Sequence, residues 1–381
     1  MFLGDYFNNI KNNYKNFFFS GTAFNSNQVK KDNIFFAIKG NKVDGNNFIL
    51  SAIRNGAKII VTEKKEDGLK NDILFIQSRN VRKLLAEISF KIYNNIPKNI
   101  IAVTGTNGKS SIADFYYQIL DLNKKKVASI GTLGVKSKNL KMNLLNTTID
   151  PIKLSKILSN LKKRNIDNVI MEASSHGLKQ NRLDGLLFNT GIFTNLSQDH
   201  LDYHKNLKNY LKAKLYLFEK LIKKNGNVIA DKEIPQFQKI KKITLNKNLN
   251  LYSLNSQKNN FQYLSHKFQR EAQLLQISHN NLIYKIKLNL IGKIQLKNVQ
   301  MAIAAAIKSD IDVKKILKVI PKIKSVEGRF EKIGKIKNQS KVILDYAHTP
   351  DALRTCLLNL KEQFPGQKIS LVFGCGGNRD Q

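Results

Sequence analysis

Hydrophobic and polar residues form two kinds of pattern along this chain. Short apolar runs typical of strands occupy residues 33–38 and 58–62, and residues 81–93 have the spacing of an amphipathic helix. From residue 99 strands and helices are predicted in alternation, with strands at 100–104, 126–130, 168–173 and 191–194, a helix that ends at residue 122, and helices at 154–163 and 210–222. This alternation predicts an α/β fold, in which helices cover both faces of a mostly parallel sheet.

The pattern of predicted strands and helices changes twice more towards the C-terminus. Residues 249–290 are strand-rich and polar, which predicts an antiparallel excursion, and helices are expected at 301–307 and 313–320. After Pro321 a new β-α-β run is predicted at 341–346, 351–360 and 369–374. A chain of 381 residues is too long for one core. We expect domains at 1–97, 98–325 and 326–381, the last incomplete because it stops after one β-α-β unit.

Composition excludes several classes of protein. The N-terminus lacks the apolar core and cleavage site of a signal peptide, and no apolar run approaches the roughly 20 residues that span a bilayer. Cys356 and Cys375 are too few for a disulfide framework. We therefore expect a soluble, cytoplasmic protein.

The net charge of +36 would normally indicate a polyanionic partner. The lysines are instead spread along the whole chain, together with much Asn and Ile, which favours a compositional bias over solvated surfaces. Nucleic-acid or membrane-surface binding stays open as the alternative.

A glycine-rich turn carries the strongest chemical signal. The apolar run Ile101–Thr104 leads into Gly-Thr-Asn-Gly-Lys-Ser-Ser, and a helix follows. Glycines let backbone N–H groups face phosphate oxygens, and a helix N-terminus favours anions. Val103 stands where the general pattern has a further Gly, so the loop is a shortened version. The predicted ATP-binding residues are Gly105, Thr106, Asn107, Gly108, Lys109, Ser110 and Ser111.

Further blocks extend the pattern over essentially the whole chain. Residues 36–40 read Phe-Ala-Ile-Lys-Gly and 171–176 read Met-Glu-Ala-Ser-Ser-His, and similar blocks occupy 195–204, 210–214, 327–330, 345–351 and 374–380. Together with the phosphate loop, they resemble the Mur ligases, and within them the UDP-N-acetylmuramoyl-tripeptide synthetases. The resemblance implies a three-domain ligase of peptidoglycan synthesis. It would add a diamino acid to UDP-N-acetylmuramoyl-L-alanyl-D-glutamate through an acyl phosphate, with ATP and Mg²⁺ as cofactors.

The resemblance also implies roles for the residues that act on phosphate and metal. Lys109, Glu172, His200 and Lys214 are implied as catalytic, and Ser110, Glu172, His200 and Lys214 as metal-binding. Lys214 would react with carbon dioxide to form a carbamate, because an anion there could hold Mg²⁺. By spacing alone Lys214 could lie on a solvated helix face. The His200-x-x-x-His204 spacing with Asp199 and Asp202 could instead form a transition-metal site or a polar loop.

Contacts to the substrates are implied in the same way. The UDP-substrate residues would be Ser26, Asn41, Lys42, Val43, Asn146, Thr147, Thr148, Ser174, Gln180 and Arg182. Asn298, Arg329 and Asp345 would contact the adenine nucleotide, and Arg379 the incoming amino acid. Taken alone, Asn298 could begin a helix and Asp345 could cap a strand. This chain has Asn25-Ser26-Asn27 where the family usually has Asp-Ser-Arg.

Two other functions remain possible at this point. A folylpolyglutamate synthetase would share the ATP machinery, but the Ser174-Ser175-His176 block and a separate UDP-type N-terminal domain argue against it. A basic nucleic-acid-binding ATPase module would need clustered cations with interleaved aromatic residues. The sequence does not distinguish diaminopimelate from lysine as the added residue. We expect a monomer without nucleic-acid partners or membrane insertion.

Overall fold

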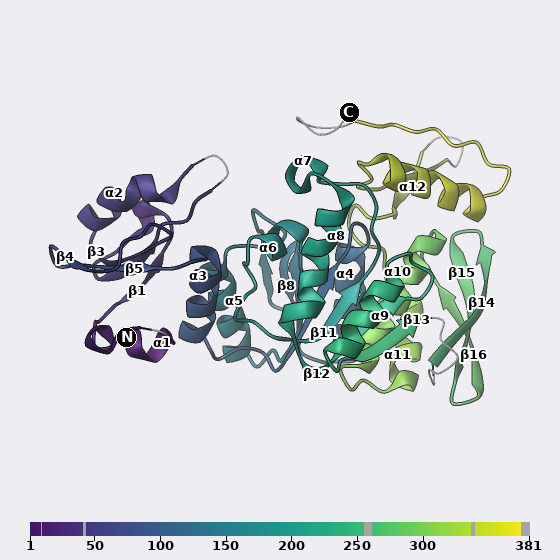
Figure 1. Cartoon of the computed structure of the whole chain (residues 1–381). Coiled ribbons are helices and arrows are strands. Elements are labelled where there is room, and N and C mark those ends of the chain that lie inside the picture. The colour runs from purple at the N-terminus through teal and green to yellow at the C-terminus, as the bar shows by residue number, and fades with distance from the viewer. Residues whose placement is uncertain (9, 41–42, 255–260, 337–339, 375–381) are drawn as a thin grey trace. The chain divides into compact units, whose positions relative to one another are not determined.

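The computed structural model describes residues 1–8, 10–40, 43–254, 261–336 and 340–374. The chain forms two compact units (Figure 1). The first contains Met1–Pro97, Thr148–Asn165 and His176–Leu187. The second contains Lys98–Thr147, Ile166–Ser175 and Phe188–Gln381.

The first unit is built on a five-stranded sheet in the order β1-β2-β3-β5-β4. All neighbours are parallel except β4 and β5. The strands are β1 (Gly21–Ala23), β2 (Asn33–Phe36), β3 (Ala57–Thr62), β4 (Gly68–Lys70) and β5 (Ile73–Gln77). Its helices are α1 (Leu3–Tyr6), η1 (Asn12–Tyr14), η2 (Ser26–Gln28), η3 (Gly45–Phe48), α2 (Ile49–Arg54), α3 (Val81–Ile92) and α5 (Pro151–Lys163).

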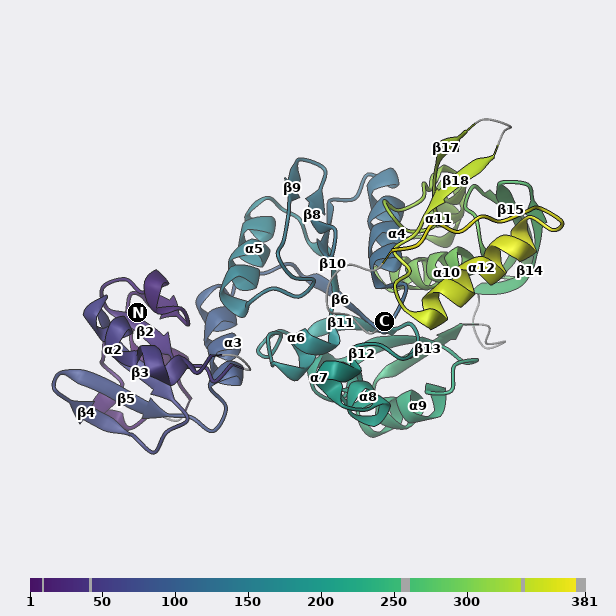
Figure 2. The ribbon, with the colours of Figure 1, turned by 90° about the horizontal axis from the view of Figure 1, so that it is seen from above.

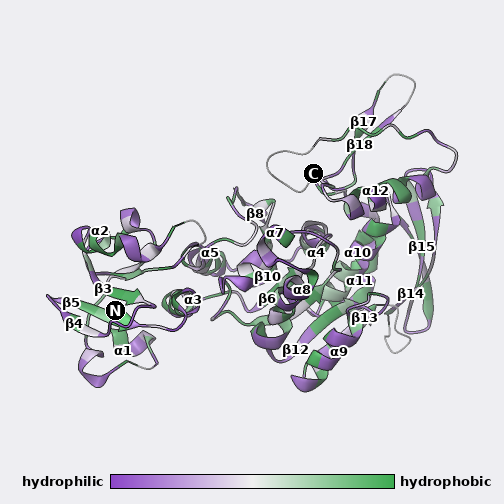
Figure 3. Cartoon of the chain, turned by 45° about the horizontal axis from the view of Figure 1, so that its top comes forward, coloured by the Kyte–Doolittle hydropathy of each residue, from purple (hydrophilic) through white to green (hydrophobic). Residues whose placement is uncertain are grey.

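Continuous apolar runs in β2 and β3 follow from burial on both faces of this sheet. Phe36 and Val61 pack against α3, whereas Phe35 and Ile60 pack with Ala52 of α2. In Figure 3 β3 is largely green, while α9 of the second unit (Phe237–Asn246) carries both colours, as an amphipathic surface helix does.

An eight-stranded sheet forms the centre of the second unit, in the order β13-β12-β11-β6-β10-β7-β8-β9. Strands β13 to β7 in this order are parallel, and β8 and β9 are antiparallel additions. The strands are β6 (Asn99–Thr104), β7 (Val127–Gly131), β8 (Gly134–Ser137), β9 (Leu140–Met142), β10 (Asn168–Glu172), β11 (Phe188–Phe193), β12 (Ile222–Asp231) and β13 (Asn250–Leu254). The predicted mostly parallel sheet is confirmed.

Helices cover both faces of this sheet. Helices α4, α10 and α11 share one apolar cluster with the inner strands, whereas Phe218 packs on Phe193 of β11 from the other side. The helices of this unit, besides α9, are α4 (Lys109–Leu122), α7 (Leu201–His204), α8 (Leu207–Tyr216), η4 (Leu217–Leu221), α10 (Lys293–Ile307), α11 (Val313–Val319), η5 (Ile320–Lys322) and α12 (Pro350–Gln363). The short α6 (Ser175–Lys179) runs from this unit into the first.

Two small antiparallel sheets complete the second unit. Strands β14 (Phe261–Gln269), β15 (Ala272–His279) and β16 (Leu282–Leu288) lie beside α10 and α11 (Figure 1), and β17 (Glu331–Lys335) pairs with β18 (Lys341–Leu344). Leu275, Ile277 and Ile286 bury one face of the three-stranded sheet in the main apolar cluster. The predicted antiparallel excursion is confirmed for these three strands, but β13, predicted within it, belongs to the parallel sheet.

Three predicted elements need correction. The expected strand 369–374 is wrong: these residues form no strand, and Val372 is 99% exposed, with no described strand beside it to accept its backbone hydrogen bonds. The helix expected at 301–307 begins earlier, at Lys293. The helix expected at 210–222 gives way to a π-helical turn after Tyr216, and Ile222 already starts β12. Within the described residues, no helix is long and apolar enough to cross a membrane.

Candidate functional site

The loop between β6 and α4 curls so tightly that two of its positions require glycine. Gly105 has φ +145° and Gly108 has φ +87°, a region that side chains rarely adopt. A Cβ atom on Gly105 would lie 1.8 Å from Thr194 Oγ1, and one on Gly108 would lie 2.6 Å from Asn298 Oδ1. Neighbouring elements therefore close around the loop backbone.

Residues after β11 fix this loop. The backbone N–H of Asn107 donates to Asn195 Oδ1 over 2.9 Å, and Thr194 Oγ1 donates to the Asn107 carbonyl over 2.6 Å. The N–H of Thr106 donates to the Asn195 carbonyl over 3.0 Å. The loop is thus held in one shape by the carboxyl end of the adjacent strand.

Lys109 opens helix α4 and folds back over the loop. Its Nζ donates to the carbonyl oxygens of Gly105, at 3.0 Å, and Thr106, at 2.6 Å. Burial lowers the pKa of this ammonium group, and the carboxylates of Glu172 and Asp199 oppose the shift. The Lys109 side chain therefore lies directly over the glycine-rich loop.

Glu172 ends β10 beside the loop and is 2% exposed. Its two carboxylate oxygens accept hydrogen bonds from the N–H of Thr132, at 2.8 Å, and from the Thr132 hydroxyl, at 3.2 Å. The Thr132 hydroxyl lies 3.0 Å from that of Thr147. The carboxylate is thereby fixed in orientation at the carboxyl end of the sheet.

Lys214 lies inside the protein, which excludes the solvated-face alternative for it. The side chain is 1% exposed, its Nζ donates to the Gly105 carbonyl over 2.7 Å, and it lies 4.0 Å from the centre of the Tyr210 ring. Burial lowers the pKa of this amine well below its ordinary value, and the charge of Lys109 lowers it further.

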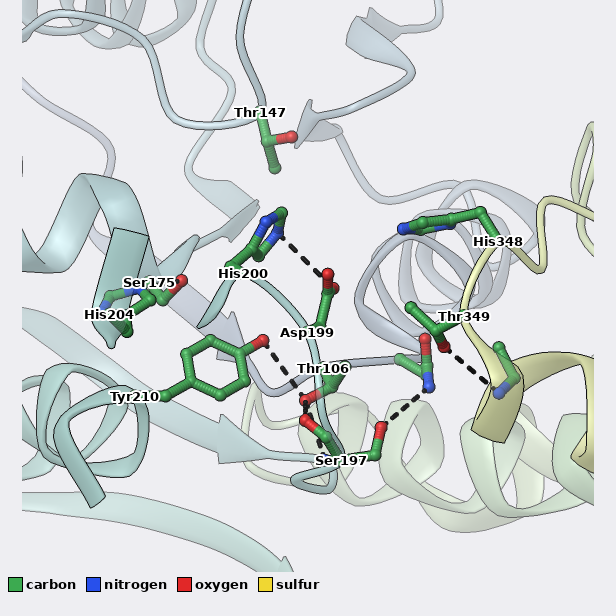
Figure 4. Close-up of polar contacts among 12 residues, drawn as sticks. Thr106, Thr147, Ser175, Ser197, Asp199, His200, His204, Tyr210, His348 and Thr349 are labelled. Carbon is green, nitrogen blue, oxygen red and sulfur yellow. Dashed lines mark hydrogen bonds and ion pairs between the residues drawn. The ribbon is translucent and has the colours of Figure 1, made fainter. Parts of the chain in front are cut away.

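The two histidines of the His200-x-x-x-His204 segment face different neighbours (Figure 4). His200, at φ +54°, lies 3.5 Å from Asp199, and burial lowers the pKa of its imidazole. His204 is buried and its Nε2 lies 3.0 Å from Ser175 Oγ. Among the described residues no three His, Cys, Asp or Glu side chains form a group that could hold a metal ion, which does not support the transition-metal alternative.

A pocket of about 490 Å³ joins these residues to the last part of the second unit. Arg329 lies with its guanidinium carbon 4.3 Å from the centre of the Tyr346 ring, and burial lowers its pKa. Asp345 accepts hydrogen bonds from the N–H groups of Phe330 and Ala347, and burial raises its pKa. The pocket lining includes the predicted residues Thr106, Asn107, Gly108, Lys109, Ser110, Ser111, Thr147, Glu172, Ser174, His200, Lys214, Asn298, Arg329 and Asp345.

Three family models match the chain. They are the Mur ligase family catalytic domain at residues 19–97, the Mur ligase middle domain at 103–306 and the Mur ligase glutamate ligase domain at 328–381. The UDP-N-acetylmuramoyl-L-alanyl-D-glutamate--2,6-diaminopimelate ligase of Rickettsia prowazekii is 37% identical over 98% of this chain and 77% of its own length. The ligase of the same name from Zymomonas mobilis is 36% identical over 95% of this chain and 74% of its own length. The chain belongs to the Mur ligase family.

Solved structures agree with this assignment. A UDP-N-acetylmuramoyl-L-alanyl-D-glutamate--2,6-diaminopimelate ligase superposes on this Mur ligase with a TM-score of 0.82, at 27% identity, over 100% of this chain and 78% of the other. The MurF ligase of Thermotoga maritima in complex with ADP has a TM-score of 0.62 at 20% identity, over 91% of this chain and 75% of its own, and shows the shared fold.

The predicted UDP-substrate residues of this Mur ligase fall in both units. In the first unit, Arg182 donates to Gln180 Oε1 at 2.7 and 3.1 Å and to the Thr148 carbonyl, while Ser26 is buried and Val43 exposed. In the second unit, Thr147 and Ser174 line the pocket around the glycine-rich loop, and Asn146 is exposed. Asn41, Lys42 and Arg379 lie outside the described residues.

Sequence reasoning missed several residues of this site, among them Tyr210, Thr132 and Ser197. Tyr210 and Thr132 line the pocket, and the Thr106 hydroxyl donates a hydrogen bond of 3.3 Å to the carbonyl oxygen of Ser197. Thr132 lies two residues after the predicted strand 126–130, so the rule that parallel strands present their carboxyl ends at one edge could have found it.

Proposed function

We propose that this Mur ligase uses ATP to join a diamino acid, 2,6-diaminopimelate, to UDP-N-acetylmuramoyl-L-alanyl-D-glutamate through an acyl phosphate. The observation that carries the proposal is the meeting of Lys109, Glu172 and Lys214 around one glycine-rich loop, in a chain 37% identical to a ligase of that name. Lys109 would supply positive charge to the phosphates of a nucleotide, while Glu172 and a carbamate on Lys214 would supply anionic oxygens for the Mg²⁺ ion that accompanies them.

The loop suits a polyphosphate because glycine at two positions allows its tight curl. Gly105 and Gly108 have positive φ and pack against Thr194 and Asn298, and α4 presents its N-terminus at the same point. Lys109, now bonded to the carbonyls of Gly105 and Thr106, would exchange these for phosphate oxygens. Asn298, Arg329 and Asp345 would bind the rest of the nucleotide from the opposite wall.

The donor set also suits Mg²⁺, which prefers carboxylate and hydroxyl oxygens. Glu172 and Ser110 would hold the ion, with His200 as a further ligand, and a bound ion would neutralise charge on the phosphates. The lowered pKa of His200 keeps its imidazole neutral near pH 7, as a metal ligand must be.

Lys214 is suited to react with carbon dioxide. Because burial lowers its pKa, more of the amine is neutral, and a neutral amine is the form that attacks the carbon atom of CO₂. The N–C bond forms, one proton leaves the nitrogen for the solvent, and the neutral amine becomes a carbamate anion. That anion would add oxygen ligands for Mg²⁺ next to Glu172, and it would replace the present hydrogen bond to Gly105.

The remaining assignments are proposals of the same standing. The division at 1–97, 98–325 and 326–381 would give a UDP-substrate domain, an ATP-binding domain and an amino-acid-binding domain. Ser26, Val43, Asn146, Thr147, Thr148, Ser174, Gln180 and Arg182, together with Asn41, Lys42 and Arg379, would bind the two substrates. We further propose a cytoplasmic, monomeric enzyme.

The test is to measure phosphate release from ATP in the presence of the UDP-muramoyl dipeptide, with meso-diaminopimelate or L-lysine as the second substrate. Release that requires both the dipeptide and diaminopimelate is expected. Release that instead requires a folate and glutamate would contradict the proposal. Equal turnover with lysine would correct only the identity of the added residue.

A further inference from the structure

A second, larger pocket lies in the same unit, away from the phosphate loop. It has a volume of about 1100 Å³ and is lined by residues of the β14–β15 turn, the end of β16 and the strands β17 and β18. Figure 2 shows β17 and β18 near one end of the unit, close to β14 and β15. Among the described residues the two linings share Phe330, and no residue of the loop 105–111 lines the larger pocket.

The lining of this pocket is unusually basic even for this chain. Five of its thirteen lining residues are Lys or Arg, whereas Lys and Arg make up 64 of the 381 residues overall. They come from separate elements, and they are Arg270, Lys287, Lys332, Lys335 and Lys341. The single acid in the lining is Glu271. The fold therefore gathers cations here beyond the general bias of the sequence.

Glu271 is the acid that faces these cations within the described lining. Lys332 forms an ion pair with Glu271, and this lysine, followed by Lys341 and Lys335, holds the pKa of the Glu271 carboxyl below its ordinary value. Lys335 and Lys341 are also direct partners across the β17–β18 ladder. Like charges opposite each other destabilise a strand pair. A multivalent anion in the pocket would relieve this repulsion.

We propose that this pocket binds a compact anion carrying two or more phosphate groups. The walls supply cations from several directions, as a small oligophosphate requires. A single-stranded nucleic acid would need exposed aromatic rings on which bases stack, but Phe330, the one aromatic residue of the lining, is 4% exposed. The lining therefore favours an oligophosphate over a nucleic acid.

The test is isothermal titration calorimetry with inorganic tripolyphosphate. Wild type, Lys109→Ala, the pair Lys335→Gln/Lys341→Gln, and the pair Lys314→Gln/Lys315→Gln are compared. The last pair removes the same charge from exposed positions of α11 in the same unit, which makes it the matched control. Circular dichroism and thermal melting check that each variant folds.

We expect Lys109→Ala to retain one binding event, since the pocket does not involve the phosphate loop. Removing Lys335 and Lys341, two of the five cations, should raise the Kd for tripolyphosphate about tenfold or more. The control pair should change that Kd less than about twofold. An equal loss of affinity in the two double variants would show that binding depends on net charge alone, and would overturn the proposed site. Absence of binding in Lys109→Ala would assign it to the phosphate loop instead. Tighter binding of an eight-residue oligothymidylate than of tripolyphosphate would overturn the choice of ligand. None of these outcomes depends on the proposed ligase activity.

Discussion

The amine of Lys214 donates a hydrogen bond of 2.7 Å to the carbonyl oxygen of Gly105, the first residue of the phosphate loop. This lysine is almost fully buried in a chain where most lysines are exposed, and the loop it contacts lies 109 residues earlier. A buried amine needs a chemical reason, because desolvating a cation is costly.

The carbamate assignment makes a spectroscopic prediction for Lys214. Protein equilibrated with ¹³C-bicarbonate should give a slowly exchanging carbamate ¹³C signal, and Lys214→Ala should lose that signal. Ligase activity should fall by about a hundredfold or more and recover partly with a short carboxylate such as acetate, which replaces the lost oxygens. Full activity in the unrescued variant, or an unchanged signal, would remove Lys214 from the chemistry.

Replacing Lys109 tests the phosphate loop itself. Lys109→Ala should lower phosphate release from ATP by about 10²–10³-fold, because the variant lacks a cation aimed at the phosphates. The melting temperature should stay within a few degrees, since the hydrogen bonds of this side chain within the described part of the chain go to the loop carbonyls of Gly105 and Thr106. Unchanged turnover would refute the assignment, and a collapsed melting temperature would show that the lysine is structural.

Thr132 is predicted to position Glu172. In Thr132→Val the carboxylate keeps its backbone hydrogen bond but loses the one from the hydroxyl. Removing such an outer partner of a metal ligand typically weakens metal binding by about 10–100-fold. Mn²⁺ binding followed by electron paramagnetic resonance should show that loss, and Thr132→Ser should restore binding. Equal Mn²⁺ affinity in the valine and serine variants would contradict this role.

Cys356 lines the pocket around the glycine-rich loop, but its thiol should be unreactive. Burial raises the pKa of its thiol to about 12, so little thiolate is present at pH 8. Iodoacetamide should therefore label it at least about a hundredfold more slowly than the same residue in unfolded protein. Mass spectrometry of the peptide containing Cys356 measures both rates, and similar rates would show that the thiol is accessible and ionised.

The sequence predicted the sheet well where one physical signal dominates. The predicted strand 100–104 matches β6, because a fully buried strand is continuously apolar. Helix α10 was placed too late because its first half buries Gln295, Asn298 and Gln300, whose polarity hides the core-facing pattern. The strand predicted at 369–374 failed because an apolar run becomes a strand only where another strand pairs with it.

The site residues show the same contrast between local sequence signals and long-range pairings. The sequence singled out Gly105, Gly108 and Lys109 because a phosphate-binding loop has a fixed spacing along the chain, and their role stays a prediction. Thr132 was not found, since its role depends on Glu172, which lies 40 residues later in the sequence. Such a pairing depends on the order of strands in the sheet, and no local pattern reveals it.

The order of strands also has a consequence for synthesis of the protein. Strand β6 is the first strand of the large sheet to emerge, yet its two partners, β10 and β11, begin only at Asn168 and Phe188. At roughly 5–20 residues per second, the apolar β6 waits several seconds on the ribosome before either partner exists. During that time its unpaired edges are a natural target for a chaperone, so slowed translation between residues 104 and 168 should increase aggregation of the nascent chain more than slowing after residue 193.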